Sequence, residues 1–303
     1  MRKFILRTFL FFALVVIMDV AFGYVFIYLR SHAKSGLTEK CEYIANKSKD
    51  DIIILGSSRA VHHYVPQVIE DSLGLSCYNC GQEGNGVVLA YGRFKMLTSR
   101  YNPKLIIYEV TPDFDYGNVD SNSKYLSYLR PYYDSNSEIN NIISVFDDEL
   151  SSLKMKSKMY QNTAKILNNI RDLFGSVDKH KGYVPIYGKM NPNNSKKQTI
   201  IDNYTVDSLK FSYMERLIVE AKSMDIPLLF IVSPRYNDSD YFKGCGPAVG
   251  LCNKYNVNFI NFIDCETVSN NIEYFQDNGH LNNNGAIAYT NLIVNAVLRG
   301  FKF

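Results

Sequence analysis

A serine near the start of the chain and an acid–histidine pair near its end are the residues best suited to nucleophilic chemistry. Ser58 follows Gly56 and Ser57, and Asp277 stands three positions before His280. A serine hydroxyl is a weak nucleophile until a base removes its proton, and that base needs a third group to fix its tautomer. In a turn, a spacing of three brings the carboxylate to Nδ1 and leaves Nε2 facing outward. We therefore expect Nε2 of His280 to meet the hydroxyl of Ser58.

Each of these features also has a structural interpretation. Serine is a favoured N-cap residue, so Gly-Ser-Ser alone could be a loop that caps a helix, and an isolated Asp-x-x-His pair is usually structural. His62 is a rival base because it lies four positions after Ser58. The sequence offers His62 no evident carboxylate partner, and helix side chains lean towards the N-terminus. The combination of Ser58 with the distant pair is what favours catalysis.

The residues around Ser58 predict a strand, a sharp turn and a helix. Residues 52–55 are four consecutive aliphatic residues, typical of a parallel strand buried on both faces. Residues 59–73 carry apolar side chains at helical spacing, although Pro66 makes the first part irregular or starts a second helix. Ser58 is thus predicted at the carboxyl edge of a sheet, where free N–H groups of a helix face a ligand.

The rest of the chain repeats this strand and helix alternation, which predicts a parallel α/β sheet of about five strands with helices on both faces. The further strands are expected at residues 75–79, 104–110, 226–234 and 257–262. Between about 121 and 203 the alternation breaks, and we expect a helical insert within a domain covering 51–303. Asp113 follows the third strand, where acidic residues either face a ligand crevice or cap a turn.

The N-terminal region predicts a membrane anchor. Residues 8–29 form an apolar run whose only ionised side chain is Asp19, and about 20 residues span a bilayer. Asp19 costs about 3 kcal/mol near the helix centre, but roughly fifteen apolar residues at about −0.3 to −0.6 kcal/mol each outweigh it. We expect an anchor over 1–30 and a tether with an early helix over 31–50. Basic residues at 2, 3 and 7 favour a cytoplasmic N-terminus and an extracytoplasmic domain.

Two alternatives concern this anchor. A cleaved signal peptide is the main rival, because Ala21, Phe22 and Gly23 offer small residues at cleavage-like spacing. The apolar run continues beyond that point, which favours an uncleaved anchor. Asp19 could also pair with another intramembrane protein.

Composition and motifs exclude several classes of partner and cofactor. A net charge of +3 over 303 residues gives no electrostatic case for nucleic acid binding. The glycine-rich turn at 81–86 lacks the spacing of a dinucleotide site or a P-loop, so no nucleotide cofactor is expected. Cys77 and Cys80 end a strand, so a redox role is disfavoured, and the spacing of Cys245 and Cys252 does not suit zinc. We expect no metal, and a local disulfide between Cys245 and Cys252.

The order of these blocks resembles that of the SGNH, or GDSL-like, hydrolase superfamily, in particular its membrane-anchored bacterial members. Gly56-Ser57-Ser58-Arg59 is similar to the first block, usually Gly-Asp-Ser, with Ser57 in place of the aspartate. The stretch 79–84 is similar to the second block, whose last glycine, here Gly84, gives a backbone N–H to the oxyanion. Residues 277–280 match the fifth block. The likeness covers roughly 50–115 and 205–300, and it implies a three-layer flavodoxin-like fold.

The third block departs from the family pattern. Its Gly-x-Asn-Asp would fall near residues 111–113, and no asparagine stands there. The oxyanion hole would then consist of the N–H groups of Ser58 and Gly84, unless Arg59 or the insert supplies a donor. The loss of one donor can cost on the order of 10²–10³ in rate. We expect Arg59 and Asp113 to bind substrate.

The sequence thus predicts a membrane-anchored, extracytoplasmic serine esterase or O-acyltransferase-like enzyme without a cofactor. The resemblance implies that it acts on esters of an acetyl or short acyl group with a cell-envelope polysaccharide, through an acyl-Ser58 intermediate. The alternative is a catalytically degenerate protein of the same fold that binds or assembles glycan.

Overall fold

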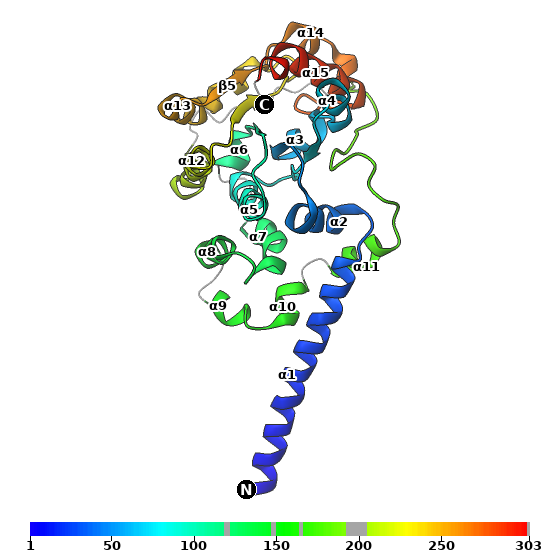
Figure 1. Cartoon of the computed structure of the whole chain (residues 1–303), viewed down its shortest axis with the longest axis vertical. Helices are drawn as coiled ribbons and strands as arrows, with labels where there is room; N and C mark the ends of the chain where they lie inside the picture. Colours follow the sequence, from blue (N-terminus) through cyan, green and yellow to red (C-terminus); the bar gives the residue numbers. More distant parts are fainter. Residues whose placement is uncertain (118–121, 147–149, 164–165, 192–204, 302–303) are drawn as a thin grey trace. The chain divides into compact units, whose positions relative to one another are not determined.

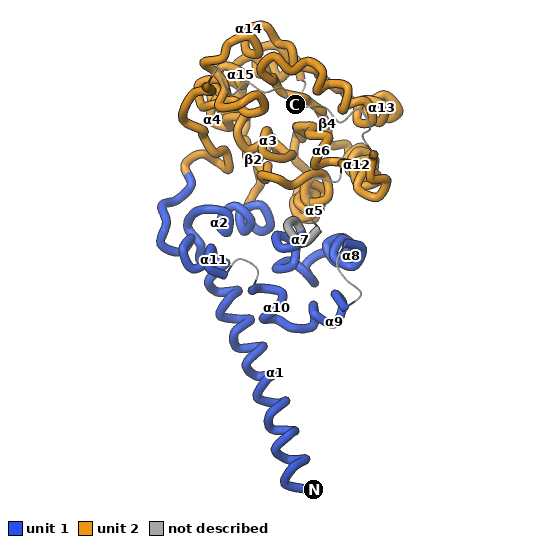
Figure 2. Tube along the Cα trace, turned by 180° about the vertical axis from the view of Figure 1, so that it is seen from behind, with its two compact units in different colours: residues 1–47, 122–178 blue, residues 48–121, 179–303 orange. Residues whose placement is uncertain are grey.

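The computed structural model describes residues 1–117, 122–146, 150–163, 166–191 and 205–301. These residues form two compact units, and each is described by itself. Unit 1 combines Met1–Lys47 with Asn122–Asp178, and unit 2 combines Ser48–Ser121 with Lys179–Phe303 (Figure 2). The chain therefore passes from unit 1 to unit 2, returns to unit 1 and ends in unit 2.

Unit 2 is built on a parallel sheet of five strands in the order β2-β1-β3-β4-β5. This is a doubly wound order of the flavodoxin type. The predicted α/β fold is confirmed, and each predicted strand is present; β1 is one residue longer than predicted and the other four are shorter. The strands are β1 (Ile52–Gly56), β2 (Cys77–Asn79), β3 (Leu105–Glu109), β4 (Leu228–Val232) and β5 (Asn258–Asn261). Register places Gly56 opposite Glu109 and Glu109 opposite Ile231, so the carboxyl ends of β1, β3 and β4 meet at one edge.

Helices cover both faces of this sheet. On one face, Ile54, Ile107 and Ile231 pack in a core cluster with side chains of α3 (Ser58–His63), α4 (Pro66–Leu73) and α15 (Asn283–Ala296). Figure 1 shows α4 beside α15. On the other face lie α5 (Val87–Thr98) and α12 (Ser208–Ser223), which contact each other, β1 and β4. The four strands other than β5 are fully buried, as their aliphatic sequences require.

Pro66 divides the helical segment after β1 into two helices. The predicted helix over 59–73 is two helices, because Val65 is extended before Pro66 and Pro66 opens α4. The remaining elements of unit 2 are α6 (Pro112–Asp115), α13 (Gly246–Tyr255), α14 (Glu266–Ser269) and the 3₁₀ turns Ser239–Cys245, Ile272–Tyr274 and Leu298–Gly300.

Unit 1 is helical wherever it is described. Its elements are α1 (Arg2–Ser31), α2 (Gly36–Glu42), a π-helix over Tyr43–Lys47, α7 (Asn122–Leu129), the 3₁₀ turn Arg130–Tyr132, α8 (Ser137–Phe146), α9 (Ser151–Lys154), α10 (Lys158–Asn162) and α11 (Ile166–Leu173). The stretch predicted as a tether is thus helical and packed over Gly36–Lys47, with Thr38 and Glu42 buried.

The last part of the predicted insert, from Lys179 onward, belongs to unit 2. Residues 192–204 lie outside the described residues, but the chain from Lys179 onward is part of unit 2. The N–H of Asn79 donates to the carbonyl of Lys181 at 2.9 Å, and the N–H of Val184 donates to the carbonyl of Val61 at 3.1 Å. This returning segment therefore packs against the strand and helix that flank the predicted site.

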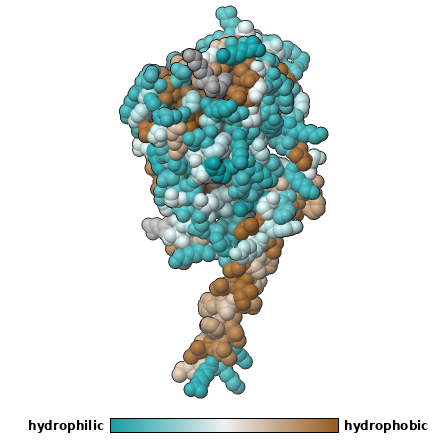
Figure 3. All heavy atoms as spheres, in the orientation of Figure 1, coloured by the Kyte–Doolittle hydropathy of each residue, from teal (hydrophilic) through white to brown (hydrophobic). Residues whose placement is uncertain are grey.

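The helix α1 is long and apolar enough to cross a membrane. Of the described helices it alone meets that test, and very little of its apolar stretch is buried within the protein. Figure 3 shows apolar side chains along its length and hydrophilic ones at its free end. A membrane anchor and a signal sequence both fit this helix.

All six cysteines are free, so the predicted disulfide between Cys245 and Cys252 is wrong. Cys245 caps α13 and Cys252 lies within it. Seven helical positions rise about 10 Å, which exceeds the roughly 7 Å that a disulfide allows between Cα atoms. Both thiols are buried, and burial raises the pKa of each to about 12.

Two glycines of unit 2 offer a matched test of this packing. A Cβ at Gly86, the N-cap of α5, would lie 1.9 Å from the carbonyl oxygen of Phe114, whereas a Cβ at Gly250 in α13 meets nothing within 4 Å. We expect Gly86→Ala to lower the free energy of unfolding by about 1–3 kcal/mol or more. Gly250→Ala should raise it by about 0.5–1 kcal/mol. Denaturant unfolding of the full chain in detergent measures both, and equal effects would contradict the packing described.

Candidate active site

Ser58 is the first residue of α3, directly after the turn that ends β1. Gly56 has φ +139°, and a Cβ there would lie 2.6 Å from the carbonyl oxygen of Glu109. Only glycine allows the chain to turn so close to β3. The Oγ of Ser58 lies 2.8 Å from Nε2 of His280. Residues separated by 222 positions are therefore in hydrogen-bond contact, as the sequence predicts.

Asp277 holds the ring of His280 in one orientation. Its carboxylate oxygens lie 3.1 and 3.0 Å from Nδ1 of His280, and it also accepts the N–H groups of Gly279 and His280, each at 2.8 Å. Burial favours a raised pKa for Asp277, but these hydrogen bonds and the charge of His280 lower the pKa below its usual value. An ionised carboxylate accepts the Nδ1 proton, which leaves Nε2 able to accept the proton of Ser58.

The loop that carries this pair is fixed at both ends. Phe275 and Leu281 form an antiparallel bridge, and the N–H of Gln276 donates to the carbonyl of His280 at 2.9 Å. The N–H of Tyr236 donates to the carbonyl of Asn278 at 3.0 Å. The side chains themselves remain accessible, with 58% of Asp277 and 31% of His280 exposed. The three groups therefore combine a rigid backbone with access for a ligand.

A buried polar network lies beneath Ser58. The guanidinium of Arg59 forms an ion pair with Glu109 at 3.0 Å, and both side chains are at most 2% exposed. Glu109 also accepts hydrogen bonds from the hydroxyl of Tyr64 and from the N–H and Oγ of Ser233. Burial raises the pKa of Glu109, while Arg59, Tyr64 and Ser233 counteract that rise. Arg59 was expected to bind substrate; its charge is balanced by Glu109 in the core, and its role in binding stays a prediction.

His63 connects this network to the loop of His280. Its Nε2 accepts the N–H of Leu281 at 3.0 Å, so its proton lies on Nδ1, which is 2.7 Å from Oγ of Ser233. Burial, followed by the nearby charge of Arg59, holds the pKa of His63 well below its usual value. A neutral His63 therefore fixes the backbone next to His280. No sequence motif pointed to this role, although His63 adjoins the rival base His62.

His62 is directed to other partners. Its Nε2 lies 2.9 Å from a carboxylate oxygen of Glu83, and its Nδ1 lies 2.7 Å from the carbonyl of Val184. The carboxylate partner that the sequence did not reveal therefore exists, in the loop after β2. Because both ring nitrogens of His62 are engaged away from Ser58, His280 is the base that the geometry favours.

The glycine-rich loop after β2 is held in place by two buried side chains. The amide of Asn79 donates to the carbonyl of Ala60 at 2.6 Å and accepts the N–H of Gly81 at 3.0 Å. Arg93 donates to the carbonyl of Gly81 at 3.2 Å. Gly84 adopts φ +60° in this loop and is half-buried, but it is not among the residues that line the cavity at Ser58. Its role as an oxyanion donor stays a prediction.

A cavity of about 270 Å³ opens beside Ser58. Asp113, expected to bind substrate, lies in its wall. Ser58, Asp277 and His280 line the same cavity. The lining residues are Ser58, Arg59, Thr111, Asp113, Phe114, Arg235, Tyr241, Asp277, Asn278, Gly279 and His280. Among the described residues, no cluster of three or more His, Cys, Asp or Glu side chains could hold a metal ion.

Arg235 and Tyr241 are cavity residues that the sequence did not single out. Arg235 forms a buried ion pair with Asp238 at 2.7 Å, and its guanidinium lies 4.0 Å from the centre of the Tyr241 ring. The one available signal was position, because Arg235 follows the fourth strand at the carboxyl edge of the sheet.

Thr111, near which the resemblance predicts the third block, is the N-cap of α6. Its hydroxyl is buried in the cavity wall and has no hydrogen-bond partner within the described part of the chain. The same is true of Nη1 of Arg59. An unpaired buried donor costs about 1–3 kcal/mol, so both atoms favour a ligand oxygen as a partner.

Comparison with known proteins gives distant likenesses only. No protein-family model and no curated protein matches the chain. One similar solved structure is a proposed acylhydrolase from Bacteroides fragilis NCTC 9343, with 11% identity and TM-score 0.41, covering 87% of this chain and 96% of that chain. Another is a proposed lipolytic protein of the G-D-S-L family from Desulfitobacterium hafniense DCB-2, with 8% identity and TM-score 0.41, covering 82% and 99%. A variant of the esterase AlinE4 gives 14% identity and TM-score 0.36, covering 84% and 99%. At these values the fold and the site rest on the residues of the chain itself.

The neutral state of His63 predicts a pH dependence of stability. The unfolded chain protonates this imidazole below about pH 6.5, whereas the folded chain resists protonation, so stability falls by about 1.4 kcal/mol per pH unit below that point. Asp277, whose pKa is lowered, adds its own loss only below about pH 4. We expect His63→Gln to flatten the decline between pH 7 and 5, and exposed His180→Gln to leave it unchanged. Denaturant midpoints of the full chain at each pH measure this, and parallel curves would contradict it.

Proposed function

We propose that this chain is an SGNH-type serine hydrolase or acyltransferase. The observation that carries the proposal is the contact of Ser58 Oγ with His280 Nε2 at 2.8 Å, with Asp277 at 3.0 Å from Nδ1 of the same ring. Nucleophile, base and orienting acid thus stand within hydrogen-bond reach in the order that acyl transfer requires.

The reaction would proceed in two steps. His280 takes the proton of Ser58 as Oγ attacks the carbonyl carbon of an ester, and Asp277 stabilises the resulting imidazolium. The same imidazolium then gives its proton to the departing alcohol, which leaves an acyl-Ser58 intermediate. Water or a sugar hydroxyl, deprotonated by His280, attacks this intermediate and restores Ser58. Water as the acceptor gives hydrolysis, and a sugar gives transfer.

We assign Thr111 to the place of the missing asparagine. The tetrahedral intermediate carries a negative oxygen, and the N–H groups of Ser58 and Gly84 are the donors that the family resemblance implies. Thr111 and Ser58 line the same cavity, and the hydroxyl of Thr111 has no hydrogen-bond partner among the described residues, which supports its use as a donor to this oxygen.

The proposed substrate is an acyl ester, such as an acetyl ester, of a cell-envelope polysaccharide. A cavity of about 270 Å³ with polar side chains such as Asp113 and Asn278 suits a short acyl group on a hydroxylated carrier. The apolar helix α1 supports anchoring of the chain in a cell membrane, with the Ser58 site on the extracytoplasmic side.

The second candidate function is glycan binding or assembly without turnover. The absent third-block asparagine favours it, since the oxyanion hole lacks its usual side-chain donor. Covalent trapping of the nucleophile separates the two functions, because only an activated serine reacts with a fluorophosphonate.

The neighbouring serine provides a matched control for this experiment. We expect Ser58→Ala to abolish fluorophosphonate labelling and to lower the hydrolysis of an acetyl ester on the order of 10³–10⁶-fold. Ser57→Ala should keep both, because the buried Oγ of Ser57 makes no hydrogen bond to the described residues. Asp277→Asn should lower the rate on the order of 10²–10⁴-fold. Unlabelled wild-type protein with intact glycan binding would favour the second function.

The role of Thr111 has a test of its own. We expect Thr111→Val, which keeps the shape and removes the hydroxyl, to lower kcat on the order of 10–10³-fold with little change in KM. Thr111→Ser should restore most of the rate. A valine variant with unchanged kcat, or a serine variant as slow as valine, would show that the oxyanion is stabilised elsewhere.

A further inference from the structure

Asp19, the one ionised side chain in the apolar run, has partners within unit 1. Its carboxylate accepts hydrogen bonds from the hydroxyl of Ser157, from the N–H of Lys158 at 2.9 Å and from the N–H of Met159 at 3.3 Å. These groups form the start of α10. Gly23, one turn further along α1, lies so close to α10 that a Cβ there would be 2.6 Å from Cβ of Lys158. The helix α10 therefore packs tightly against α1.

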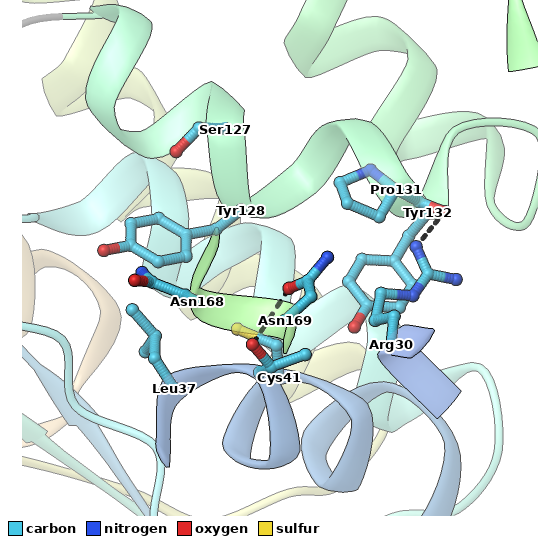
Figure 4. A pocket seen from close by; sticks show the side chains of 10 residues that line it. Arg30, Leu37, Cys41, Ser127, Tyr128, Pro131, Tyr132, Asn168 and Asn169 are labelled. Carbon is cyan, nitrogen blue, oxygen red and sulfur yellow. Dashed lines mark hydrogen bonds between the residues drawn. The ribbon is translucent and has the colours of Figure 1, made fainter. Parts of the chain in front are cut away.

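Arg30, near the end of α1, makes a second set of contacts with the same helical region. Nη1 of Arg30 donates to the carbonyl of Pro131 at 3.0 Å and to Oδ1 of Asn162 at 2.9 Å, and its guanidinium lies over the ring of Tyr132. Figure 4 shows Arg30, Pro131 and Tyr132 beside a cavity of about 30 Å³, which has room for little more than one water molecule. This cavity lies between the end of α1 and the neighbouring helices of unit 1, and it is too small to hold a ligand.

These contacts fix where the bilayer can lie along α1. A span over 8–29 would bury α10, with its backbone and lysine side chains, in hydrocarbon. At 1.5 Å per residue, the roughly 20 residues from Phe4 to Gly23 already cover about 30 Å of hydrocarbon. Arg7 then lies near the inner surface, which its long side chain can reach. Asp19 lies just inside the outer surface, where α10 satisfies its carboxylate.

The helices around α10 expose apolar side chains next to this boundary. We define the apolar rim as Leu150, Leu153 and Met159, all of them exposed. Leu150 is the N-cap of α9, Leu153 lies in α9 and Met159 lies in α10. In both views α9 and α10 lie at the edge of unit 1, and the N-terminal part of α1 extends beyond them (Figures 1 and 2). Lys154, Lys156 and Lys158 alternate along the chain with Leu153, Met155, Ser157 and Met159, of which Leu153 and Met159 are the exposed apolar residues.

We infer that the apolar rim is a membrane-docking surface that lies in the outer lipid interface beside α1. Apolar side chains alternating with lysines are typical of segments that enter the boundary between headgroups and acyl chains and bind anionic lipids. The surface is continuous with the span, because α10 contacts α1 at Asp19 and Gly23. This inference rests on the membrane anchoring proposed above, but not on the chemistry of Ser58. It places unit 1 on the bilayer rather than at the end of a free tether.

The absence of tryptophan from the chain makes a direct test possible. Single substitutions Leu150→Trp, Leu153→Trp and Met159→Trp introduce the only tryptophan on the apolar rim. Tyr187→Trp in unit 2 is the matched control, because Tyr187 is exposed (75%), as are Leu150 (60%) and Leu153 (61%). Phe12→Trp reports on the span itself. Each full-length variant is reconstituted in phosphatidylcholine–phosphatidylglycerol vesicles whose acyl chains carry bromine close to the headgroup.

We expect the three rim variants to emit at shorter wavelength and to lose most of their fluorescence to brominated lipid, while Tyr187→Trp keeps its emission. Strong quenching of Phe12→Trp by lipid brominated deep in the chain, together with rim variants no more quenched than Tyr187→Trp, would overturn the docking surface and leave the anchor intact. An unquenched Phe12→Trp would overturn the anchor and the docking surface together. Ester hydrolysis, measured in the same vesicles, reports separately on the proposed chemistry.

Discussion

The carboxylate of Glu109 sits at the carboxyl end of β3 with no exposed surface, and the geometry of the site depends on satisfying it. A buried carboxylate costs several kcal/mol unless it is paired and fully hydrogen-bonded. Its partners come from the helix after β1 and from the end of β4, through Arg59, Tyr64 and Ser233. Because each donor must reach the same two oxygen atoms, three strand ends and the start of α3 are held in one arrangement. Ser58 is the residue next to Arg59, so its position follows from this constraint.

The same network extends to the base. His63 accepts the N–H of Leu281 and contacts Ser233, so the backbone beside His280 is tied to the carboxylate of Glu109. Asp277 contacts Nδ1 of His280 while its side chain stays more than half exposed. The backbone around His280 is therefore held by buried groups, and the acid beside the ring remains accessible to solvent.

In unit 1, too, a carboxylate in an apolar setting is satisfied by hydrogen bonds from another element. Asp19 would be costly in hydrocarbon, but the start of α10 supplies its carboxylate with three hydrogen-bond donors. Near the end of α1, Arg30 donates a further hydrogen bond to Asn162 at the end of α10. A polar residue in an apolar helix therefore marks a contact within the chain, and no second membrane protein is needed to explain it.

The sequence by itself determined the features that depend on neighbours along the chain. The strand at 52–55, the helix break at Pro66 and the pairing of Asp277 with His280 follow from periodicity, proline geometry and a spacing of three. The tertiary structure decided which polar side chains are buried and with whom. Arg59 and Ser233, 174 positions apart, meet in the core, Arg235 enters the cavity wall, and Cys245 and Cys252 remain apart on one helix. The physical reason is that burying a polar group is tolerable only when distant elements bring it partners, and local sequence carries no record of those partners.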